Sequence, residues 1–420
     1  MREMKDSGIE WIGAIPQDWK TDRLQWHLKE INVSNNPIQT KNILSLTIEA
    51  GVIPYAEKGN QGNKAKEDYS QYKIALPDTL VINSMNVIIG AVGISQYFGC
   101  VSPVYYVFEP IEGTDLRYIY YLFTNTGFQK EMRKYAKGIL EIRLRISSND
   151  MLKRIVPSPP FKEQQRIADY LDKMCAEIDA VLEKTRASIE EYKKLKQAVI
   201  TQAVTKGIRG DRPMKDSGSV WFEEIPCNWV MKRIKYLFHI KKDIAGKEGY
   251  TVLSITQSGI KPKDLSKNEG QLADNYSHYQ LLNPGDFAMN HMDLLTGWVD
   301  ISKYSGVTSP DYRVFVLDDT EKNDSSYYLY LMQMCYFNRI FYGLGQGVSG
   351  MGRWRLQADK FLNFPVVVPP VDEQKEIASY LNEKCSCIEV MIAKQQQYLT
   401  EIENYKKSLI YEYVTGKREV

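Results

Sequence analysis

Residues 4–8 read Met-Lys-Asp-Ser-Gly, and the same five residues return at 214–218. The agreement extends into the following segment, where Trp11, Ile15, Pro16, Trp19 and Arg23 recur as Trp221, Ile225, Pro226, Trp229 and Arg233. Farther along, Tyr69, Tyr72, Asn83, Met85, Gly90, Ser102 and Pro103 recur as Tyr276, Tyr279, Asn290, Met292, Gly297, Ser309 and Pro310. A solenoid repeat is several times shorter than this one, so the pattern predicts two complete domains.

Each copy has two parts of different character. The first part, residues 1–157 and 208–368, alternates short β-rich runs with Gly, Pro and Asn turns. Strands are expected at 79–82, 101–108 and 313–317, and helices at 116–123 and 327–337. The two first parts are therefore predicted to be mixed α+β globules.

The second parts, residues 158–207 and 369–420, are predicted to be long helices. Each follows a Pro-Pro pair with an early glutamate, and each ends near a glycine, Gly207 or Gly416. Apolar or small residues follow a helical period at Ile167, Leu171, Met174, Ile178, Val181, Thr185, Ile189, Tyr192, Leu195, Val199 and Ala203, and at Ile377, Leu381, Ile388, Met391, Leu399, Ile402, Tyr405, Leu409 and Tyr413. A helix of about 46 residues would be about 70 Å long and needs a partner along its length.

The two apolar stripes are natural partners for each other. An antiparallel coiled coil would place the globular domains at opposite ends with a pseudo-twofold axis between them. The predicted fold is therefore α+β, with two duplicated α/β domains separated by two long antiparallel coiled-coil helices. The residues expected at the helix packing and partner interface are Ile167, Leu171, Ile178, Ile189, Ile377, Leu381, Ile388 and Leu399.

Composition narrows the class of protein. A net charge of +2 with 25% charged residues lacks the basic excess of a protein that coats nucleic acid without sequence preference. The six cysteines show no metal-ligand spacing, and no metal site is expected. The most apolar run, near 87–94, is too short to span a bilayer, so a cytoplasmic location is expected. Neither an ATP-binding Gly-x-x-x-x-Gly-Lys-Ser/Thr loop nor the Asn-Pro-Pro-aromatic motif of adenine methyltransferases occurs, which predicts a non-catalytic chain.

The ordered motifs resemble the specificity subunits of type I restriction-modification systems over essentially the whole chain. They are the opening Met-Lys-Asp-Ser-Gly, the Ile-Pro-x-x-Trp segments, the Asn-x-Met and Ser-Pro pairs, and the Pro-Pro-x-x-Glu-Gln helix starts, each present twice. The resemblance implies that each domain reads one half of a bipartite double-stranded DNA target and that the helices set the spacing. A solitary coiled-coil DNA-binding adaptor without enzyme partners is the alternative.

The resemblance also implies partners and their cofactors. Two methyltransferase subunits would use S-adenosylmethionine to modify adenine, and restriction subunits would use ATP and Mg²⁺ to translocate and cut DNA. No cofactor is expected on this chain itself.

Paired arginines are the first candidates for DNA contact. Arg143 and Arg145 in the first copy match Arg353 and Arg355 in the second, and alternate spacing would send each pair to one side of an extended strand. Arginine can bind phosphates or pair with guanine. A structural ion pair tying the domain to its helix is an equally weighted interpretation.

Further candidates carry less specific signals. Asn83 and Asn290 could read adenine edges, although an asparagine duplicated with its framework is more often structural. Lys134 and Lys137 lie in a basic cluster of the first copy, for which a solvated helix face is favoured. The segment 57–68 differs from its counterpart 261–274 and could select bases, unless it is an ordinary surface loop; its candidates are Gly59, Gln61, Asn63 and Lys64.

Overall fold

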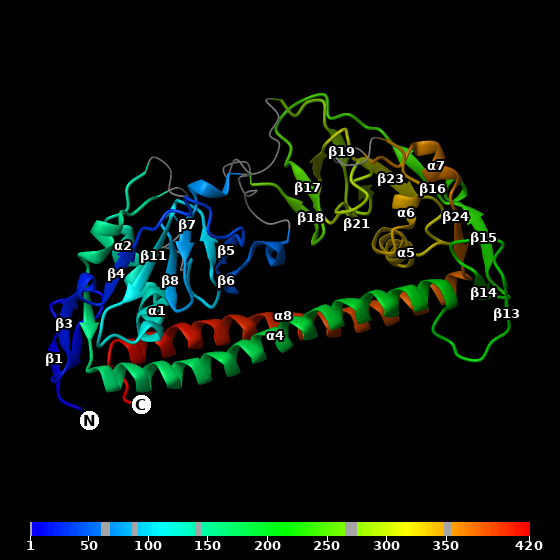
Figure 1. Ribbon diagram of the computed structural model, residues 1–420. Coiled ribbons are helices and arrows are strands. Elements are labelled where there is room, and N and C mark those ends of the chain that lie inside the picture. The colour runs from blue at the N-terminus through cyan, green and yellow to red at the C-terminus, as the bar shows by residue number, and fades with distance from the viewer. Residues whose placement is uncertain (1, 60–67, 86–90, 139–143, 265–274, 348–353) are drawn as a thin grey trace. The chain divides into compact units, whose positions relative to one another are not determined.

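The computed structural model describes residues 2–59, 68–85, 91–138, 144–264, 275–347 and 354–420. The chain forms two compact units: unit 1 is Met1–Arg186 with Gln397–Val420, and unit 2 is Ala187–Gln396. Each unit holds one copy of the globular part, one end of the first long helix and one end of the second (Figure 1). The two boundaries lie 210 residues apart and are therefore equivalent positions of the repeat.

Unit 1 has a four-stranded antiparallel sheet in the order β4-β11-β8-β9, with two-stranded sheets around it. Its strands are β1 (Met4–Asp6), β2 (Ala14–Pro16), β3 (Lys20–Arg23), β4 (Leu28–Ile31), β5 (Leu44–Thr47), β6 (Gly51–Pro54), β7 (Lys73–Ala75), β8 (Thr79–Asn83), β9 (Val92–Ser95), β10 (Gly99–Val101), β11 (Tyr105–Pro110) and β12 (Ile155–Ser158). Its short helices are α1 (Leu116–Thr124), α2 (Thr126–Arg133) and α3 (Ser148–Leu152). Side chains of β8 alternate between two cores, because Leu80 and Ile82 pack with the helices and Val81 packs on the opposite face.

Unit 2 repeats this architecture with the sheet order β16-β23-β20-β21. Its strands are β13 (Met214–Asp216), β14 (Glu224–Pro226), β15 (Val230–Arg233), β16 (Phe238–Lys241), β17 (Leu253–Thr256), β18 (Gly259–Pro262), β19 (Gln280–Leu282), β20 (Phe287–Met289), β21 (Val299–Ile301), β22 (Gly306–Thr308), β23 (Arg313–Leu317) and β24 (Pro365–Val368). Its short helices are α5 (Ser325–Phe337), α6 (Ile340–Gly343) and α7 (Ala358–Asn363). The same alternation recurs, because Phe287 and Met289 join the main core and Ala288 joins the smaller one.

Most of the elements expected from sequence are present, with one correction. The strands at 79–82 and 313–317 correspond to β8 and β23, and the two expected helices correspond to α1 and α5. The run 101–108 is not one strand, because a turn at 102–104 separates β10 from β11 and sends them into different sheets. A proline at position 103 is compatible with that break, since proline cannot donate a ladder hydrogen bond.

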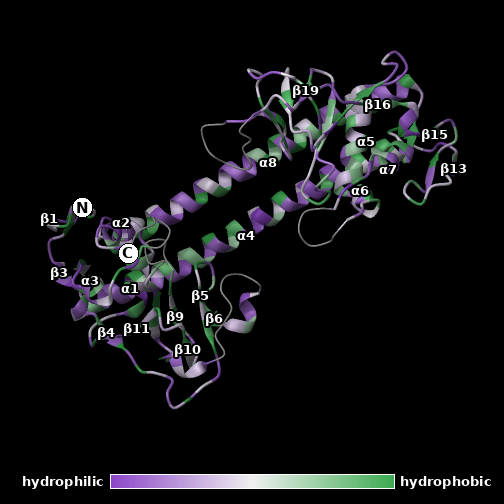
Figure 2. Cartoon of the chain, turned by 90° about the horizontal axis from the view of Figure 1, so that it is seen from above, coloured by the Kyte–Doolittle hydropathy of each residue, from purple (hydrophilic) through white to green (hydrophobic). Residues whose placement is uncertain are grey.

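The long helices are α4 (Phe161–Lys206) and α8 (Val371–Val414), and they pack together. Hydrophilic and hydrophobic residues alternate along both, as expected for helices with one covered side (Figure 2). Within unit 1 they are antiparallel, because the ring of Tyr170 lies 4.5 Å from that of Tyr413 while Lys406 donates to Asp179 at 2.6 Å. In unit 2 the equivalent ion pair joins Lys196 to Glu389. The duplication and the two long packed helices confirm the predicted fold class.

The packing seam follows a seven-residue repeat, which corrects part of the predicted stripe. In α4 the buried side chains include Leu171, Cys175, Ile178, Leu182, Thr185 and Ile189, with alternating steps of four and three residues. The predicted stripe includes Val181, Leu195, Met391 and Tyr405, but these side chains are 39–50% exposed. The predicted stripe repeats every 3.6 residues or about that, whereas the buried seam repeats every 3.5 residues. Over the length of the helix the predicted positions therefore shift from the seam to the exposed face.

Candidate nucleic-acid interface

Two asparagine turns lie at the ends of equivalent strands. Asn83 ends β8, and its side-chain oxygen accepts a hydrogen bond from the backbone N–H of Met85 at 3.1 Å. Asn290 follows β20, and its oxygen accepts from the N–H groups of Met292 and Asp293, both at 3.2 Å. Both amide oxygens therefore hold the turn that follows the strand, which is the structural interpretation of these residues.

The arginine-bearing segments lie directly beside these turns. Arg145 exchanges backbone hydrogen bonds of 2.8 and 2.9 Å with Lys137, and Arg355 exchanges bonds of 2.9 and 3.0 Å with Gln346. The residue after each arginine then donates to the residue after each asparagine: Ile146 to the carbonyl of Ser84 at 3.2 Å, and Leu356 to the carbonyl of His291 at 2.9 Å. The structure thus brings the arginine and asparagine candidates together in both copies.

The two described arginines present exposed side chains. Within the part of the chain that the structure describes, neither Arg145 nor Arg355 forms an ion pair. The guanidinium groups are therefore available to a ligand, and the interpretation as a structural ion pair finds no partner there. Arg143 and Arg353 lie outside the described residues.

A side chain of the sheet supports each arginine-bearing segment, and sequence reasoning missed both. The Tyr106 hydroxyl on β11 donates to the carbonyl of Ile146 at 3.1 Å, and Arg313 on β23 donates to the carbonyl of Leu356 at 2.8 Å. Position 313 follows position 106 by the offset of 207 that holds for this part of the repeat. Only that alignment could have indicated the shared role, since the two residue types differ.

The second copy carries a buried positive charge at this place. Arg313 is 6% exposed, and no carboxylate pairs with it among the described residues. Burial lowers its pKa to about 10, which still leaves it charged at neutral pH, and its guanidinium lies 5.0 Å from the ring centre of Phe361. Burial, Arg313 and Arg355 together lower the pKa of His291 to about 4. Unit 2 therefore has a buried cation beside its exposed arginine, where unit 1 has the neutral Tyr106.

The remaining DNA-contact candidates are only partly described. Lys134 pairs with Glu10 and Glu131, both at 2.9 Å, while Lys137 is exposed on the segment opposite Arg145. Gly59 ends a 3-10 helix, Tyr55–Lys58, with a positive φ of 68°. Gln61, Asn63 and Lys64 lie outside the described residues. The ion pairs of Lys134 agree with the solvated helix face favoured for that cluster.

The helix candidates lie along the seam. Seven of them are at most 7% exposed, and Leu399 is partly buried: the seven are Ile167, Leu171, Ile178, Ile189, Ile377, Leu381 and Ile388. Five of the seven, all except Ile189 and Ile388, belong to the main core of their own unit. These five therefore lie between the helices and the globular parts.

The Glu-Gln pair at the start of each long helix fixes the globular part of its own unit. Arg2 binds Glu163 at 2.5 Å, and Arg212 binds Glu373 in the same way. Each arginine also lies over a buried tryptophan, Arg2 at 5.8 Å from Trp19. These contacts join residues 161 apart in the sequence, so no local pattern could have revealed them.

The adjacent glutamine caps the first helix of each globular part. The Gln164 side-chain oxygen accepts from the N–H of Asp115 at 3.0 Å, and Gln374 accepts from Asp324 at 2.8 Å. Two fully buried tyrosines complete the contact: Tyr118 donates to the carbonyl of Val414 at 3.0 Å, and Tyr327 donates to that of Val204 at 3.1 Å. The duplicated Pro-Pro-x-x-Glu-Gln motif thus has a docking role in both units.

No cluster of three or more metal-ligating side chains is found within the described residues. The same residues contain no helix long and apolar enough to cross a membrane. In both units an exposed arginine, Arg145 or Arg355, lies on a segment that backbone hydrogen bonds fix beside the sheet.

Comparison with known proteins identifies the family to which the chain belongs. The model for the type I restriction modification DNA specificity domain matches residues 16–191 and again residues 226–401. The specificity subunit of the type I restriction enzyme MjaVIII of Methanocaldococcus jannaschii is 26% identical over 321 residues, which cover 73% of this chain and 71% of that protein.

Solved structures show the same fold. A chain from a structure of the type I R-M system, described for its complex assembly and conformational transition, has a TM-score of 0.70 at 12% identity and covers 96% of this chain and 99% of its own. The HsdS subunit from Thermoanaerobacter tengcongensis has a TM-score of 0.50 at 12% identity, with 98% and 100% covered.

The chain belongs to the type I restriction modification DNA specificity domain family, because the family model matches it once in each copy and over more than half of its length. It is a recognition chain and not an enzyme, in agreement with the description of the family as a DNA specificity domain and of the curated relative as a specificity subunit. The family also gives it no cofactor of its own.

Proposed function

We propose that this chain is the subunit that reads a bipartite DNA target, one half-site with residues 1–157 and the other with residues 208–368. Segments 158–207 and 369–420 act as spacer helices between the readers. The observation that carries the proposal is the duplicated site, in which an exposed arginine is hydrogen-bonded through its backbone beside an asparagine turn in both units. Two such sites on one chain suit a target with two separate halves.

Arg145 and Arg355 are the residues proposed to contact DNA, together with Arg143 and Arg353. A planar guanidinium can pair with the O6 and N7 atoms of guanine or bind a phosphate. The first reader, residues 1–157, has further candidates for DNA contact. They are Lys137 and the segment with Gly59, Gln61, Asn63 and Lys64, which would extend the contacts made by the arginines. Asn83 and Asn290 act on DNA indirectly, because they hold the turns beside the arginines.

The proposed partners supply the chemistry. Two methyltransferase subunits would bind S-adenosylmethionine and modify adenine, and restriction subunits would use ATP and Mg²⁺ to act on DNA. The chain would direct both to the target in the cytoplasm. Co-purification with a methyltransferase subunit supports this assembly, whereas a chain that binds its DNA target and never recruits an enzyme subunit would be the solitary adaptor.

The test removes one pair of arginines at a time. Methylation mapping of host DNA first identifies both half-sites, and the assembled methyltransferase is then footprinted with Arg143→Ala/Arg145→Ala or Arg353→Ala/Arg355→Ala. Each double variant should weaken protection of one half-site and leave the other, which serves as the internal control. The loss of a base contact should weaken the free energy of DNA binding by about 1–3 kcal/mol. The loss of a phosphate contact should reduce by about one the slope of the logarithm of the binding constant against the logarithm of the salt concentration. Unchanged footprints and salt slopes in folded variants would contradict the proposal.

A further inference from the structure

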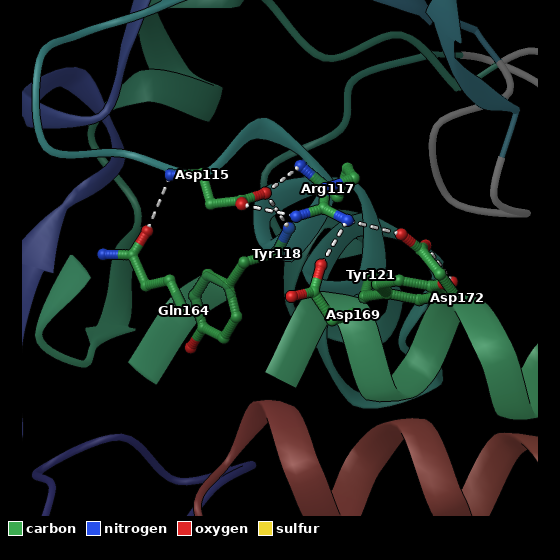
Figure 3. A network of polar contacts seen from close by, with 7 residues as sticks. All are labelled: Asp115, Arg117, Tyr118, Tyr121, Gln164, Asp169 and Asp172. Atoms are coloured by element: carbon green, nitrogen blue, oxygen red, sulfur yellow. Dashed lines mark hydrogen bonds and ion pairs between the residues drawn. The ribbon is translucent and has the colours of Figure 1, made fainter. Parts of the chain in front are cut away.

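The two units attach their globular parts to the long helices through one shared set of contacts, and each unit adds contacts of its own. In unit 2, Arg209 binds Glu376 on α8 at 2.7 Å. The shared set is the Arg–Glu pair, the glutamine cap and the buried tyrosine described above. The additional set of unit 1 surrounds Arg117 at the start of α1 (Figure 3). Because this set of contacts joins α1 to α4, its presence in one copy alone would restrict the orientation of that globular part more than that of the other.

Arg117 binds three carboxylates from two elements. One guanidinium nitrogen donates to Asp169 at 2.7 Å and to Asp172 at 2.8 Å, both on α4, and the other donates to Asp115 at 3.0 Å. Asp115 is also the N-cap of α1, where it accepts from the backbone N–H of Arg117 at 2.9 Å. Tyr121, one turn later, donates to Asp172 at 2.8 Å. We name Arg117, Asp169, Asp172 and Tyr121 the α1 clamp.

Unit 2 has neutral residues at the same places. Ser326 follows the N-cap Asp324 by two residues, as Arg117 follows Asp115, and α5 contains no charged residue at all. On α8, Ser379 and Asn382 stand where α4 has Asp169 and Asp172. Only the tyrosine contact remains, because Tyr330 donates to Asn382 at 2.9 Å. No ion pair joins α5 to α8 in the described part of unit 2.

We propose that Arg117 is a positioning residue that fixes the orientation of the first reader on α4, so that an ion-pair network holds α1 of the first reader whereas none holds α5 of the second. The inference rests on the proposed function. The α1 clamp is 39% exposed at Arg117 and 68% at Asp169, so salt can screen it. Exposed ion pairs contribute little to folding stability. The role proposed for the α1 clamp is therefore to restrict the angle between the first globular part and α4. Loosening it should widen the range of spacers that the protein accepts.

The first measurement follows orientation without DNA. Spin labels at cysteines introduced at Lys41 and Glu177, with the exposed Cys227 and Cys387 changed to serine, report distances within unit 1 of the full chain. The matched pair in unit 2 is Glu248→Cys with the natural Cys387. The unit 1 distribution should be narrow at 0.1 M salt and broad at 1 M, where the screening length falls from about 10 Å to about 3 Å. The unit 2 distribution should change less with salt, because no ion pair joins α5 to α8.

Reciprocal variants then exchange the two arrangements. Arg117→Ser/Asp169→Ser/Asp172→Asn gives unit 1 the residues of unit 2, and Ser326→Arg/Ser379→Asp/Asn382→Asp does the reverse. The first variant should broaden the unit 1 distribution already at 0.1 M, and the second should make the unit 2 distribution more sensitive to salt than in the wild type. Arg117→Lys should give an intermediate width, because a single ammonium cannot bridge three carboxylates as a guanidinium does.

The second measurement uses the assembled methyltransferase on targets with altered spacers. Removing the α1 clamp should lower the preference for the correct spacer over one longer by a base pair about threefold to tenfold, as expected for a network of exposed pairs. Unchanged label distances and an unchanged spacer profile, in a variant that folds, would overturn the positioning role. Loss of thermal stability with both profiles intact would also overturn it. Absence of any specific DNA binding by the wild type would instead overturn the proposed function.

Discussion

Tyr106 in unit 1 and Arg313 in unit 2 hold equivalent carbonyl groups, yet one is neutral and the other is a buried cation. Where the globular parts meet the long helices, the copies instead share residue types, as Tyr118 and Tyr327 do. The duplication thus keeps the tyrosine contacts that attach a reader, although not the α1 clamp, and it varies the charge buried beside the exposed arginines. Two half-sites of different sequence would require that division.

The largest expected effect on DNA binding comes from lengthening one of the two long helices without the other. Seven residues inserted after Ile189, or after Leu399, preserve the seven-residue seam of one helix but leave its partner short. Either insertion alone should reduce DNA binding more than about a hundredfold, because part of the seam loses its packing. Gel-shift titration of each assembled complex measures this.

Both insertions together restore the match and provide the control. The helix pair should lengthen by about 10 Å, which corresponds to about three base pairs. Because the readers also turn relative to the DNA grooves, the optimum should move to a longer spacer or tight binding should be lost. An unchanged optimum at full activity would show that the helices do not set the distance.

A second prediction compares the buried ion pairs. Glu373 is 2% exposed and also accepts from the indole N–H of Trp229 at 2.9 Å, whereas the Glu163 side chain is 10% exposed. Glu373→Gln should destabilise unit 2 by about 3–5 kcal/mol, because Arg212 would keep a buried charge without its partner. Glu163→Gln should cost unit 1 less.

Hydrogen exchange in urea can follow the two units separately. Equal losses in the two variants would contradict the inference that burial makes the unit 2 pair more costly to break. Asp319→Asn, on an exposed pair with Lys322, is the control and should have little effect.

A third prediction tests the part that the copies share. Burial raises the pKa of Tyr118 and of Tyr327 well above the usual range, so both hydroxyls stay protonated donors. Tyr118→Phe and Tyr327→Phe should each cost about 1–3 kcal/mol, since buried carbonyl groups lose their donor. The same exchange measurement should find nearly equal losses. A difference of several-fold between them would show that the two docking contacts are not equivalent in energy.

The smallest effect concerns pH. The pKa of His291 is lowered from 6.5 to about 4, so the unfolded chain binds this proton first as the pH falls. The stability contributed by neutral His291 is therefore present above pH 6.5 and is lost between pH 6.5 and 4. His291→Ser, which introduces the residue found at Ser84, should reduce the loss of unit 2 stability between pH 7 and pH 5. His27 in unit 1 is unchanged in the wild type and in the His291→Ser variant, so unit 1 is the internal control. An identical pH dependence of unit 2 stability in the two proteins would contradict the prediction.

Local signals predicted the long elements well. The Pro-Pro pair before Phe161 and the glycine after Lys206 gave α4 the bounds that the structure has, because both residue types restrict the backbone directly. The seam was harder to predict, since apolar residues such as Val181 also lie on the outer face and the sequence does not say which stripe is covered. Burial in the fold decides between them.

The candidate interface was predicted only in outline. The repeat identified Arg145 and Arg355 as a pair, but it could not show that Arg313 supports one of them, because a tyrosine takes its place in the other copy. The docking contact of Arg2 was missed for a different reason, since its partner Glu163 is 161 residues away. Residues that act across such distances become visible only when the chain is folded.

Unit 2 is one uninterrupted stretch of chain, and its two boundaries fall at equivalent points inside the long helices. In genetic terms, the segment encoding Ala187–Gln396 is a cassette, because a recombination event with crossovers at those two points would exchange a reader together with the helix halves that cover it. The seven-residue seam has the same phase at both crossovers, so the spliced helices would stay in register. A new sequence preference could then be inherited in one step rather than through successive point mutations.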